Sequence, residues 1–277
     1  MAEENLRADV ALCARGLAAS RERAQALISA GLAYADGAPI KKSAQKLAPD
    51  AVLEVRGEWC PYVSRGGFKL EKALRCFGID ASGAVAIDVG ASTGGFTDVL
   101  LQSGARLVYA VDVGTAQLDA RLAADPRVIS MEQTNARALR RDMFPDPPTL
   151  GVMDVSFISI TKILPALREV LGDRGRLVSL VKPQFEAGRS ALGKNGIITN
   201  PAVHERVLQD VVAAAPACGW RVRAYDFSPI AGTQGNLEFL ADLVPDDGCT
   251  PSPDPGEIRG LVRRAHAELR KNDKPIR

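Results

Sequence analysis

The sequence predicts an α/β protein: a large, doubly wound domain preceded by a small α+β module. Short apolar strands alternate with helical stretches from about residue 84 onwards, a pattern typical of a parallel sheet covered on both faces. A glycine-rich turn, Gly90–Phe96, follows the first of these strands. Residues 1–56 instead contain two short helical stretches and an Asp36-Gly37 hairpin signal, which indicate a separate unit.

Within the small module we expect one helix from Leu6 to about Gly16 and a second that begins after Ser20 and ends at Gly31. Strands are expected over residues 32–35, 40–42 and 52–55. The large domain is predicted to open with a helix over 68–76. Its expected strands are 85–89, 107–112, 127–130, 150–154, 176–181, 222–227 and 237–243.

The predicted boundaries are a module over residues 1–56, a linker over 57–63, a main domain over 64–247 and a C-terminal tail over 248–277. The linker contains Pro61, which disfavours helix at the residue before it. The tail contains an amphipathic helix over 255–271 that we expect to pack on the main domain.

Composition excludes several classes of protein. The 277 residues are 46% hydrophobic and 25% charged with a net charge of +2, so charge alone does not indicate a polyanion partner. Five scattered cysteines without a CxxC pair, and two histidines without HExxH spacing, predict reduced thiols and no metal site. With no signal-peptide pattern and no apolar run near 18 residues, we expect a cytoplasmic protein with no membrane contact.

Basic residues cluster locally in the small module. Residues 15–46 carry six basic and two acidic side chains, which would attract phosphates without sequence preference. A solvated helix face is the plainer interpretation of the same cluster. The candidate RNA contacts are Arg7, Arg15, Arg21, Arg23, Lys41, Lys42, Lys46 and Arg65.

The turn after strand 85–89 predicts an adenosine site, because glycines let a ligand approach the backbone at a helix N-terminus. Asp112, at the end of the next strand, is placed to accept both ribose hydroxyls. Ser92 stands where a dinucleotide site needs glycine, and Asp88 suits a cationic ligand, so S-adenosyl-L-methionine is favoured over a dinucleotide. The candidate cofactor residues are Asp88, Gly90, Ser92, Thr93, Gly94, Gly95, Phe96, Asp112, Val113, Asn135 and Asp154.

The same turn permits a different enzyme class. Gly90–Gly94 also fits the G-x-S-x-G nucleophile elbow, with Ser92, Asp154 and His204 in the chain order of a hydrolase triad. However, His204 follows Asn200-Pro201 at a helix start, and no HGGG-like oxyanion segment is present. The hydrolase interpretation is therefore the weaker one.

Four charged residues are candidates for catalysis. Asp154 and Lys182 each end an apolar strand, where ligands bind in sheets of this kind. Glu238 lies inside an apolar run, which is unusual for a carboxylate without a partner. Lys69, in the helix after Arg65-Gly66-Gly67, faces outward and would by itself be a surface charge.

Together, Lys69, Asp154, Lys182 and Glu238 resemble the Lys-Asp-Lys-Glu tetrad of FtsJ-like ribose methyltransferases. The segments at 64–70, 154–159 and 181–186 resemble the TlyA (hemolysin A) family, and the run over 16–37 is similar to the RNA-binding domain of a small-subunit ribosomal protein. The resemblance implies a Rossmann-like fold and S-adenosyl-L-methionine-dependent 2′-O-methylation of ribosomal RNA. It also implies that the four residues are catalytic and that ribosomal RNA or ribosomal subunits are the partners, with no obligate protein partner.

The chemistry fits the residue types, because a ribose 2′-hydroxyl must lose its proton as it attacks a methyl carbon. Lys182 is the candidate base, which requires a neutral amine; Lys69 and the sulfonium favour that form, whereas the two acids oppose it. Alternatively, the tetrad positions the ribose and water takes the proton. The loop over 186–196 either closes over RNA or simply connects two elements. An RNA-binding protein with an inactive domain remains the alternative function.

Overall fold

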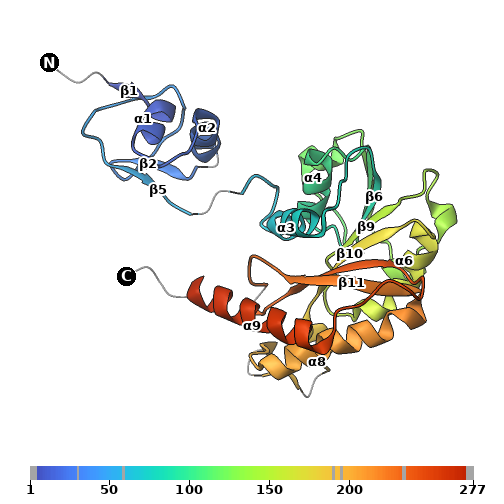
Figure 1. Cartoon of the computed structure of the whole chain (residues 1–277). Coiled ribbons are helices and arrows are strands. Elements are labelled where there is room, and N and C mark those ends of the chain that lie inside the picture. The colour runs from blue at the N-terminus through green and yellow to red at the C-terminus, as the bar shows by residue number, and fades with distance from the viewer. Residues whose placement is uncertain are drawn as a thin grey trace. The chain divides into compact units, whose positions relative to one another are not determined.

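The computed structural model describes residues 5–29, 31–57, 60–188, 191–193, 196–232 and 235–272. The chain divides into two compact units, Met1–Pro61 and Tyr62–Arg277 (Figure 1). The predicted linker contains Glu58 and Trp59, which lie outside the described residues.

The first unit packs two helices on short strands. The helices are α1 (Ala8–Ala14) and α2 (Arg21–Ser29), and the strands are β1 (Leu6–Arg7), β2 (Ala33–Ala35), β3 (Ala38–Pro39), β4 (Lys46–Leu47) and β5 (Leu53–Val55). Strand β2 pairs with both β3 and β5, and β1 pairs with β4. The helix expected from Leu6 begins only at Ala8, because residues 6–7 pair with β4. The strand expected over 40–42 lies at 38–39, directly after the Asp36-Gly37 turn.

The second unit contains a seven-stranded sheet with the order β11-β12-β10-β9-β6-β7-β8. Its strands are β6 (Val85–Val89), β7 (Leu107–Val111), β8 (Val128–Met131), β9 (Leu150–Met153), β10 (Arg176–Val181), β11 (Trp220–Phe227) and β12 (Phe239–Pro245). Strands β6 to β10 run parallel, whereas β12 is antiparallel to both neighbours. This confirms the predicted doubly wound, mostly parallel α/β sheet.

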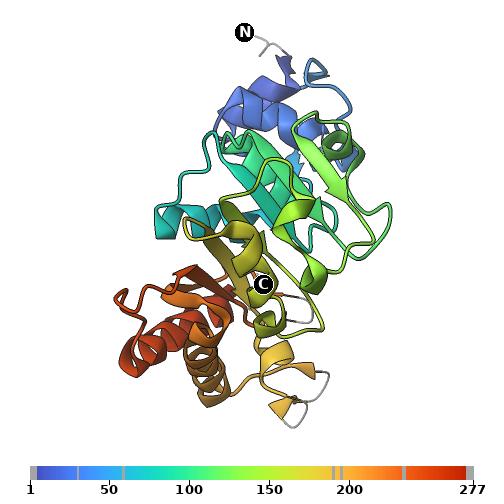
Figure 2. The same ribbon diagram turned by 90° about the vertical axis from the view of Figure 1, so that its right-hand side faces the viewer.

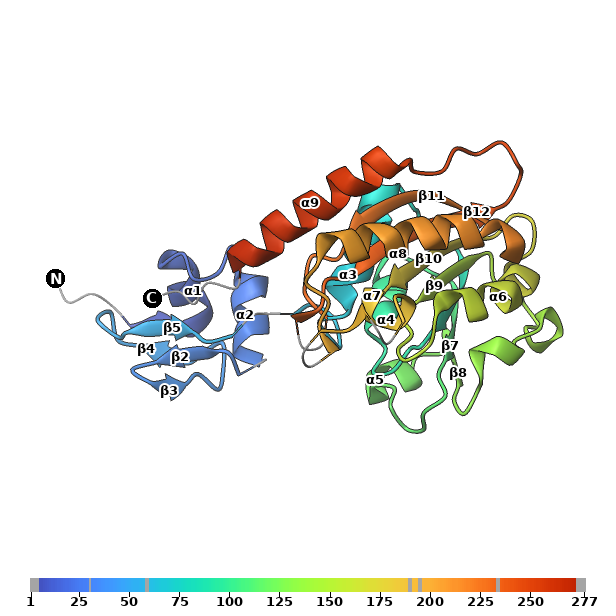
Figure 3. The ribbon, with the colours of Figure 1, turned by 90° about the horizontal axis from the view of Figure 1, so that it is seen from below.

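Helices cover both faces of this sheet (Figures 2 and 3). They are α3 (Gly67–Phe77), α4 (Gly95–Gln102), α5 (Ala120–Ala123), α6 (Leu164–Leu171), α7 (Pro183–Glu186), α8 (Pro201–Ala214) and α9 (Pro255–Asn272). Short 3-10 turns occur at η1 (Ala136–Ala138), η2 (Arg141–Met143), η3 (Ile160–Lys162) and η6 (Pro216–Cys218).

Alternate residues of the strands belong to two separate hydrophobic cores, because successive side chains of a strand point to opposite faces of the sheet. In β6, Ala86 belongs to the core under α3 and α4, whereas Ile87 belongs to the core under α6, α8 and α9. Both faces are therefore apolar, and β6 is buried along its whole length. Such strands read as continuous hydrophobic runs.

The order of the parallel strands reverses between β6 and β9, which are neighbours in the sheet. At such a switch point the loops after the two strands diverge and leave a crevice beyond their carboxyl ends. Gly90 follows β6 and Asp154 follows β9, so both lie at that crevice. Within the described residues, no helix combines the length and apolar character needed to cross a membrane.

Candidate active site

Four elements bring charged side chains to the carboxyl end of the parallel strands. Asp154 follows β9, and Lys182 follows β10. Glu238 immediately precedes β12, and the pairing of Val181 with Phe239 places the start of this antiparallel strand beside the end of β10. Lys69 comes from the first turn of α3.

The four side chains form one continuous chain of ion pairs. Lys182 Nζ lies 2.6 Å from Asp154 Oδ1, and Lys69 Nζ lies 3.4 Å from Asp154 Oδ2. Lys69 Nζ also lies 2.6 Å from Glu238 Oε2. Asp154 therefore stands between the two lysines, and Lys69 stands between the two acids.

All four groups are withdrawn from solvent to different degrees. Lys69 and Lys182 are each 8% exposed, and Glu238 is 2% exposed. The expectation that Lys69 faces outward is wrong, because the lysine is buried against two carboxylates. Burial favours its neutral form, but the attraction of Asp154 and Glu238 outweighs this and raises the pKa of Lys69. Lys69 is therefore held as a cation.

The loop after Asp154 supplies contacts that sequence reasoning missed. The Ser156 hydroxyl lies 2.9 Å from Lys182 Nζ and gives the ammonium a second partner. Phe157 is 90% exposed, has a φ of 65°, and packs its ring 5.1 Å from that of Phe185. A bulky residue in the left-handed region is strained, and such strain is concentrated at functional sites.

A cavity of about 450 Å³ lies beside the ion-pair chain. Among the predicted cofactor residues, its walls include Gly90, Ser92, Asp112, Val113, Asn135 and Asp154. Lining residues that the prediction missed are Val89, Val111, Gln117, Thr134, Ala136, Arg137, Val155, Ser156, Phe157, Ile158 and Ile163. Most of these follow β8 and β9, where loop conformation decides which side chains face the cavity.

The other predicted cofactor residues support the turn from behind. The Phe96 ring is buried in the core under α4. Gly95 is packed so tightly that a Cβ there would meet the Ser64 hydroxyl, and a Cβ at Gly94 would meet Leu122. Thr93 is exposed and is not part of the cavity wall.

The cavity fits a ligand that combines an adenosine with a cationic end. Gly90 has a φ of 84°, and a Cβ there would lie 2.6 Å from the Asp154 carbonyl oxygen, so only glycine keeps this wall open. Asp112 accepts hydrogen bonds from the backbone N–H groups of Ser92 and Gly114, both at 2.8 Å, which fixes its carboxylate for ribose hydroxyls.

Asp88, two residues before Gly90, is fully buried and is not part of the cavity wall, but it leaves one buried oxygen beside the turn. Its Oδ2 accepts a hydrogen bond of 2.7 Å from Thr97, whereas its Oδ1 is buried without a partner. Burial raises the pKa of this carboxyl to about 7. A buried unpaired oxygen is costly unless a ligand supplies a donor, and the amino group of S-adenosyl-L-methionine is such a donor.

The hydrolase triad is not assembled. His204 is buried on α8, where its Nδ1 lies 2.9 Å from Nε2 of His266, and burial lowers its pKa to about 4. The two Asp154 oxygens face lysines instead of a histidine. Ser92 therefore has no base within this arrangement.

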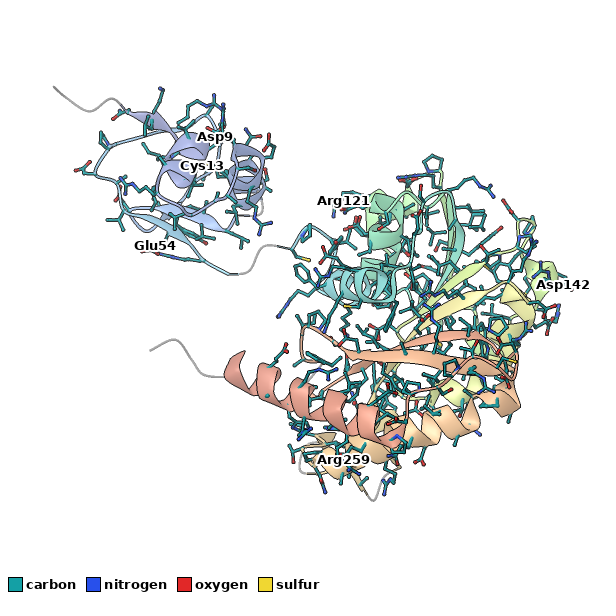
Figure 4. All side chains as sticks on the ribbon, in the orientation of Figure 1. Asp9, Cys13, Glu54, Arg121, Asp142 and Arg259 are labelled. Atoms are coloured by element: carbon teal, nitrogen blue, oxygen red, sulfur yellow. The ribbon has the colours of Figure 1, made fainter. Side chains whose placement is uncertain are left out.

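The arginines of the first unit hold that unit together. Asp9, labelled in Figure 4, is buried and accepts hydrogen bonds from Arg7 and Arg21. Arg15 donates to the carbonyl oxygens of Ala51 and Pro49. Lys46 donates to the Asn5 carbonyl, Arg23 is half-buried, and Arg65, in the second unit, is exposed.

Two lysines of the first unit differ from these arginines. Lys41 and Lys42 are exposed, and their ammonium groups have no hydrogen-bond or ion-pair partner within the described residues. Of the predicted RNA contacts in this unit, these two are the most available. Sequence reasoning could not separate them from the arginines, because the partner Asp9 is itself buried only by tertiary packing.

Comparison with known protein families identifies the family of the second unit. Residues 62–243 match the FtsJ-like methyltransferase family. The chain belongs to this family. The resemblance predicted from the sequence is therefore confirmed, and the FtsJ-like domain accounts for the cofactor: its methyl donor is S-adenosyl-L-methionine.

Relatives match most of the chain. The rRNA methyltransferase relative YqxC of Bacillus subtilis is 44% identical over 98% of both chains. The 16S/23S rRNA (cytidine-2′-O)-methyltransferase TlyA of Mycobacterium tuberculosis is 42% identical over 84% of this chain and 88% of its own. A solved structure of a protein described as a hemolysin from Streptococcus thermophilus is 48% identical, with a TM-score of 0.76, over 99% of this chain and 100% of its own.

Proposed function

We propose that this protein transfers a methyl group from S-adenosyl-L-methionine to a ribose 2′-hydroxyl of ribosomal RNA, and that Lys182 assists removal of the hydroxyl proton. The ion-pair chain from Lys182 through Asp154 and Lys69 to Glu238, beside the cofactor cavity, carries the proposal. The names of the M. tuberculosis and B. subtilis relatives support ribosomal RNA as the substrate.

The residues around Lys182 have different roles in removing the proton from the 2′-hydroxyl. The bound cofactor supplies an electrophilic methyl carbon. Lys182 in its neutral form accepts the 2′-hydroxyl proton as the oxygen attacks, while Asp154 and Ser156 orient its Nζ. Lys69 stays cationic between the two acids. Its positive charge partly neutralises Asp154, so Asp154 attracts a protonated Lys182 less strongly.

A second route keeps the same geometry but gives the proton to water. In that case the tetrad positions the ribose, and a residual rate that rises with pH remains when Lys182 is replaced. The shielding of Lys182 and its two contacts favour direct assistance, because a general base must be oriented within hydrogen-bond reach of its proton.

The surroundings of Lys182 also suit a nucleoside. The exposed Phe157 ring stands beside Phe185 at the rim of the site. RNA enzymes reach single nucleotides by splaying a base out and stacking it on an aromatic side chain. We infer that Phe157 stacks on the target base or its neighbour.

We infer that residues 1–56 form an RNA-binding domain, joined by a linker over 57–63 to the methyltransferase domain over 64–247, with a tail over 248–277. The exposed Lys41 and Lys42 provide its phosphate contacts. Arg65 adds a cation in the methyltransferase domain. Because ribosomes are the substrate source, we expect the protein in the cytoplasm. The Arg189 and Lys194 side chains of the proposed RNA-closing loop lie outside the described residues.

The decisive experiment uses labelled S-adenosyl-L-methionine and ribosomal subunits from cells that lack the protein. Label should appear in RNA, and nuclease mapping should locate it on a ribose 2′-oxygen. An RNA-binding protein with an inactive domain would retain RNA and cofactor on a filter without transferring label. Label found on a base instead of a ribose would also overturn the proposal.

A further inference from the structure

Glu186 connects the segment that follows Asp154 with the segment that follows Lys182. It ends α7, the helix that starts directly after Lys182. Its carboxylate accepts a hydrogen bond of 2.6 Å from the Ser159 hydroxyl and one of 2.9 Å from the Ile160 backbone N–H. Ser159 ends the loop that begins at Asp154, and Ile160 is the first residue of η3, which follows that loop.

The same loop has a second attachment nearer the chemistry. Ser156 contacts Lys182 Nζ at 2.9 Å, so hydrogen bonds fix the segment from Asp154 to Ile160 to the segment from Lys182 to Glu186 at two points. The ion pair of Asp154 with Lys182 and the ring contact of Phe157 with Phe185 join the same two segments. The strained Phe157 lies between these two points. A residue with unfavourable backbone angles persists only where its surroundings determine its conformation, and the two attachments do this.

Glu186 itself does not line the cofactor cavity. It is partly buried, and burial raises its pKa, although the hydrogen bonds from Ser159 and Ile160 oppose that rise. No cation pairs with it within the part of the chain that the structure describes. Burying half of a carboxylate without a cation costs free energy. The hydrogen bonds from the loop offset this cost, and we infer that holding the loop is the role of Glu186.

We propose that Glu186 is a positioning residue for methyl transfer, which holds the loop after Asp154 so that Ser156 meets Lys182 and Phe157 stays at the rim. This inference rests on the proposed function for its kinetic consequence. Its structural consequence, an ordered loop over 155–160, does not depend on the substrate.

Glu186→Gln tests the proposal, because Ser159 and Ile160 donate to different oxygens of the carboxylate. The amide keeps one acceptor oxygen and replaces the other with an NH₂ group, which cannot accept a hydrogen bond. We expect kcat for subunit methylation to fall by about 10- to 100-fold, with a smaller change in the KM for RNA, since small misplacements of catalytic groups cost this much. Ser159→Ala removes one of the two bonds alone and should show a milder loss. Glu257→Gln is the control. Glu257 also accepts a backbone hydrogen bond, of 2.9 Å from Asp254, but it lies in α9 and makes no contact with the loop after Asp154 among the hydrogen bonds described.

A double-mutant cycle separates positioning from general destabilisation. If Glu186 acts through the contact of Ser156 with Lys182, Glu186→Gln should cost clearly less in a Ser156→Ala background than in the wild type. A purely structural residue would give the same loss in both backgrounds. Equal losses, or wild-type kcat in Glu186→Gln, would overturn the proposal.

Amide hydrogen exchange tests the loop-holding role of Glu186 without RNA. Glu186→Gln should speed amide exchange over residues 155–162, whereas Glu257→Gln should leave that segment unchanged. If the wild-type protein transfers no methyl group to ribosomal RNA, the proposed function fails, and the exchange result still decides whether Glu186 holds the loop. Unchanged exchange in Glu186→Gln contradicts the inference in either case.

Discussion

Lys182 Nζ and Asp154 Oδ1 lie 2.6 Å apart, each at the end of one of two adjacent parallel strands. A single strand-to-strand spacing thus brings a candidate base against the carboxylate that orients it. The register that pairs Val178 with Val152 sets this meeting, so it depends on the whole sheet and not on a flexible loop.

Lys182→Met should abolish turnover while leaving cofactor binding essentially unchanged. The substitution keeps the length of the side chain but removes the group that accepts the proton, and a general base contributes about 10²- to 10⁴-fold. Single-turnover methylation and calorimetric titration of cofactor measure the two effects. Lys162→Met, at an exposed lysine, is the control. Retained turnover would refute the base assignment, and a residual rate rising with pH would favour the water route.

Gly90→Ala should weaken cofactor binding by at least about tenfold, which corresponds to roughly 1.4 kcal/mol. The new Cβ would lie 2.6 Å from a backbone oxygen and force the cavity wall to move. Gly78→Ala is the matched control, because Gly78 also has a positive φ but its added Cβ meets nothing within 4 Å. Both variants should be destabilised in thermal unfolding by backbone strain, but only Gly90→Ala should lose cofactor.

His204 should make the protein less stable in acid. Its pKa is lowered to about 4, so between that value and about 6.5 the unfolded chain binds more protons than the folded one. This contribution is lost as pH falls, by about 2 kcal/mol between pH 7 and 4.5. Asp88, with a pKa raised to about 7, acts in the opposite direction over the same window.

Comparison with His204→Leu isolates the histidine from Asp88. Relative to the wild type, the variant should gain about 2 kcal/mol in free energy of unfolding on acidification from pH 7 to 4.5, measured by urea titration. A constant difference between the two proteins at both pH values would show that His204 titrates normally.

Phe157→Ala should raise the KM for RNA by about 5- to 150-fold, because stacking of one base on an aromatic ring contributes about 1–3 kcal/mol. Stability should change little, since the ring is 90% exposed. Ile129→Ala, at another exposed apolar residue, controls for the reduced surface hydrophobicity. An unchanged KM would leave the exposed ring without a role in RNA binding.

Replacing both Lys41 and Lys42 with Gln should weaken RNA binding and reduce the slope of log affinity against log salt by up to about 2, because each lysine would no longer neutralise one phosphate. Cofactor affinity should be unaffected. Arg263→Gln, at an exposed arginine of α9, is the control. A salt slope equal to that of the wild type would show that these lysines do not bind phosphate.

Much of the fold could be predicted because local pattern and burial agree. Strands β6 and β10 have the predicted bounds, since each is a mostly apolar run between turn residues. Boundaries were less accurate in the first unit, where two-residue strands such as β1 exist only through their pairing partners. A pairing between residues about 40 positions apart leaves no periodic signal in either segment.

Strand periodicity and residue chemistry are local properties, so the order of amino acids was enough to predict the doubly wound sheet, the glycine turn that opens the cofactor cavity, and the four charged candidates. The burial of Lys69 between Asp154 and Glu238 could be seen only in the folded chain. The same holds for Ser156 and Glu186, which fix the loop beside Lys182. These facts depend on helix packing and strand register, which bring together side chains far apart in the chain.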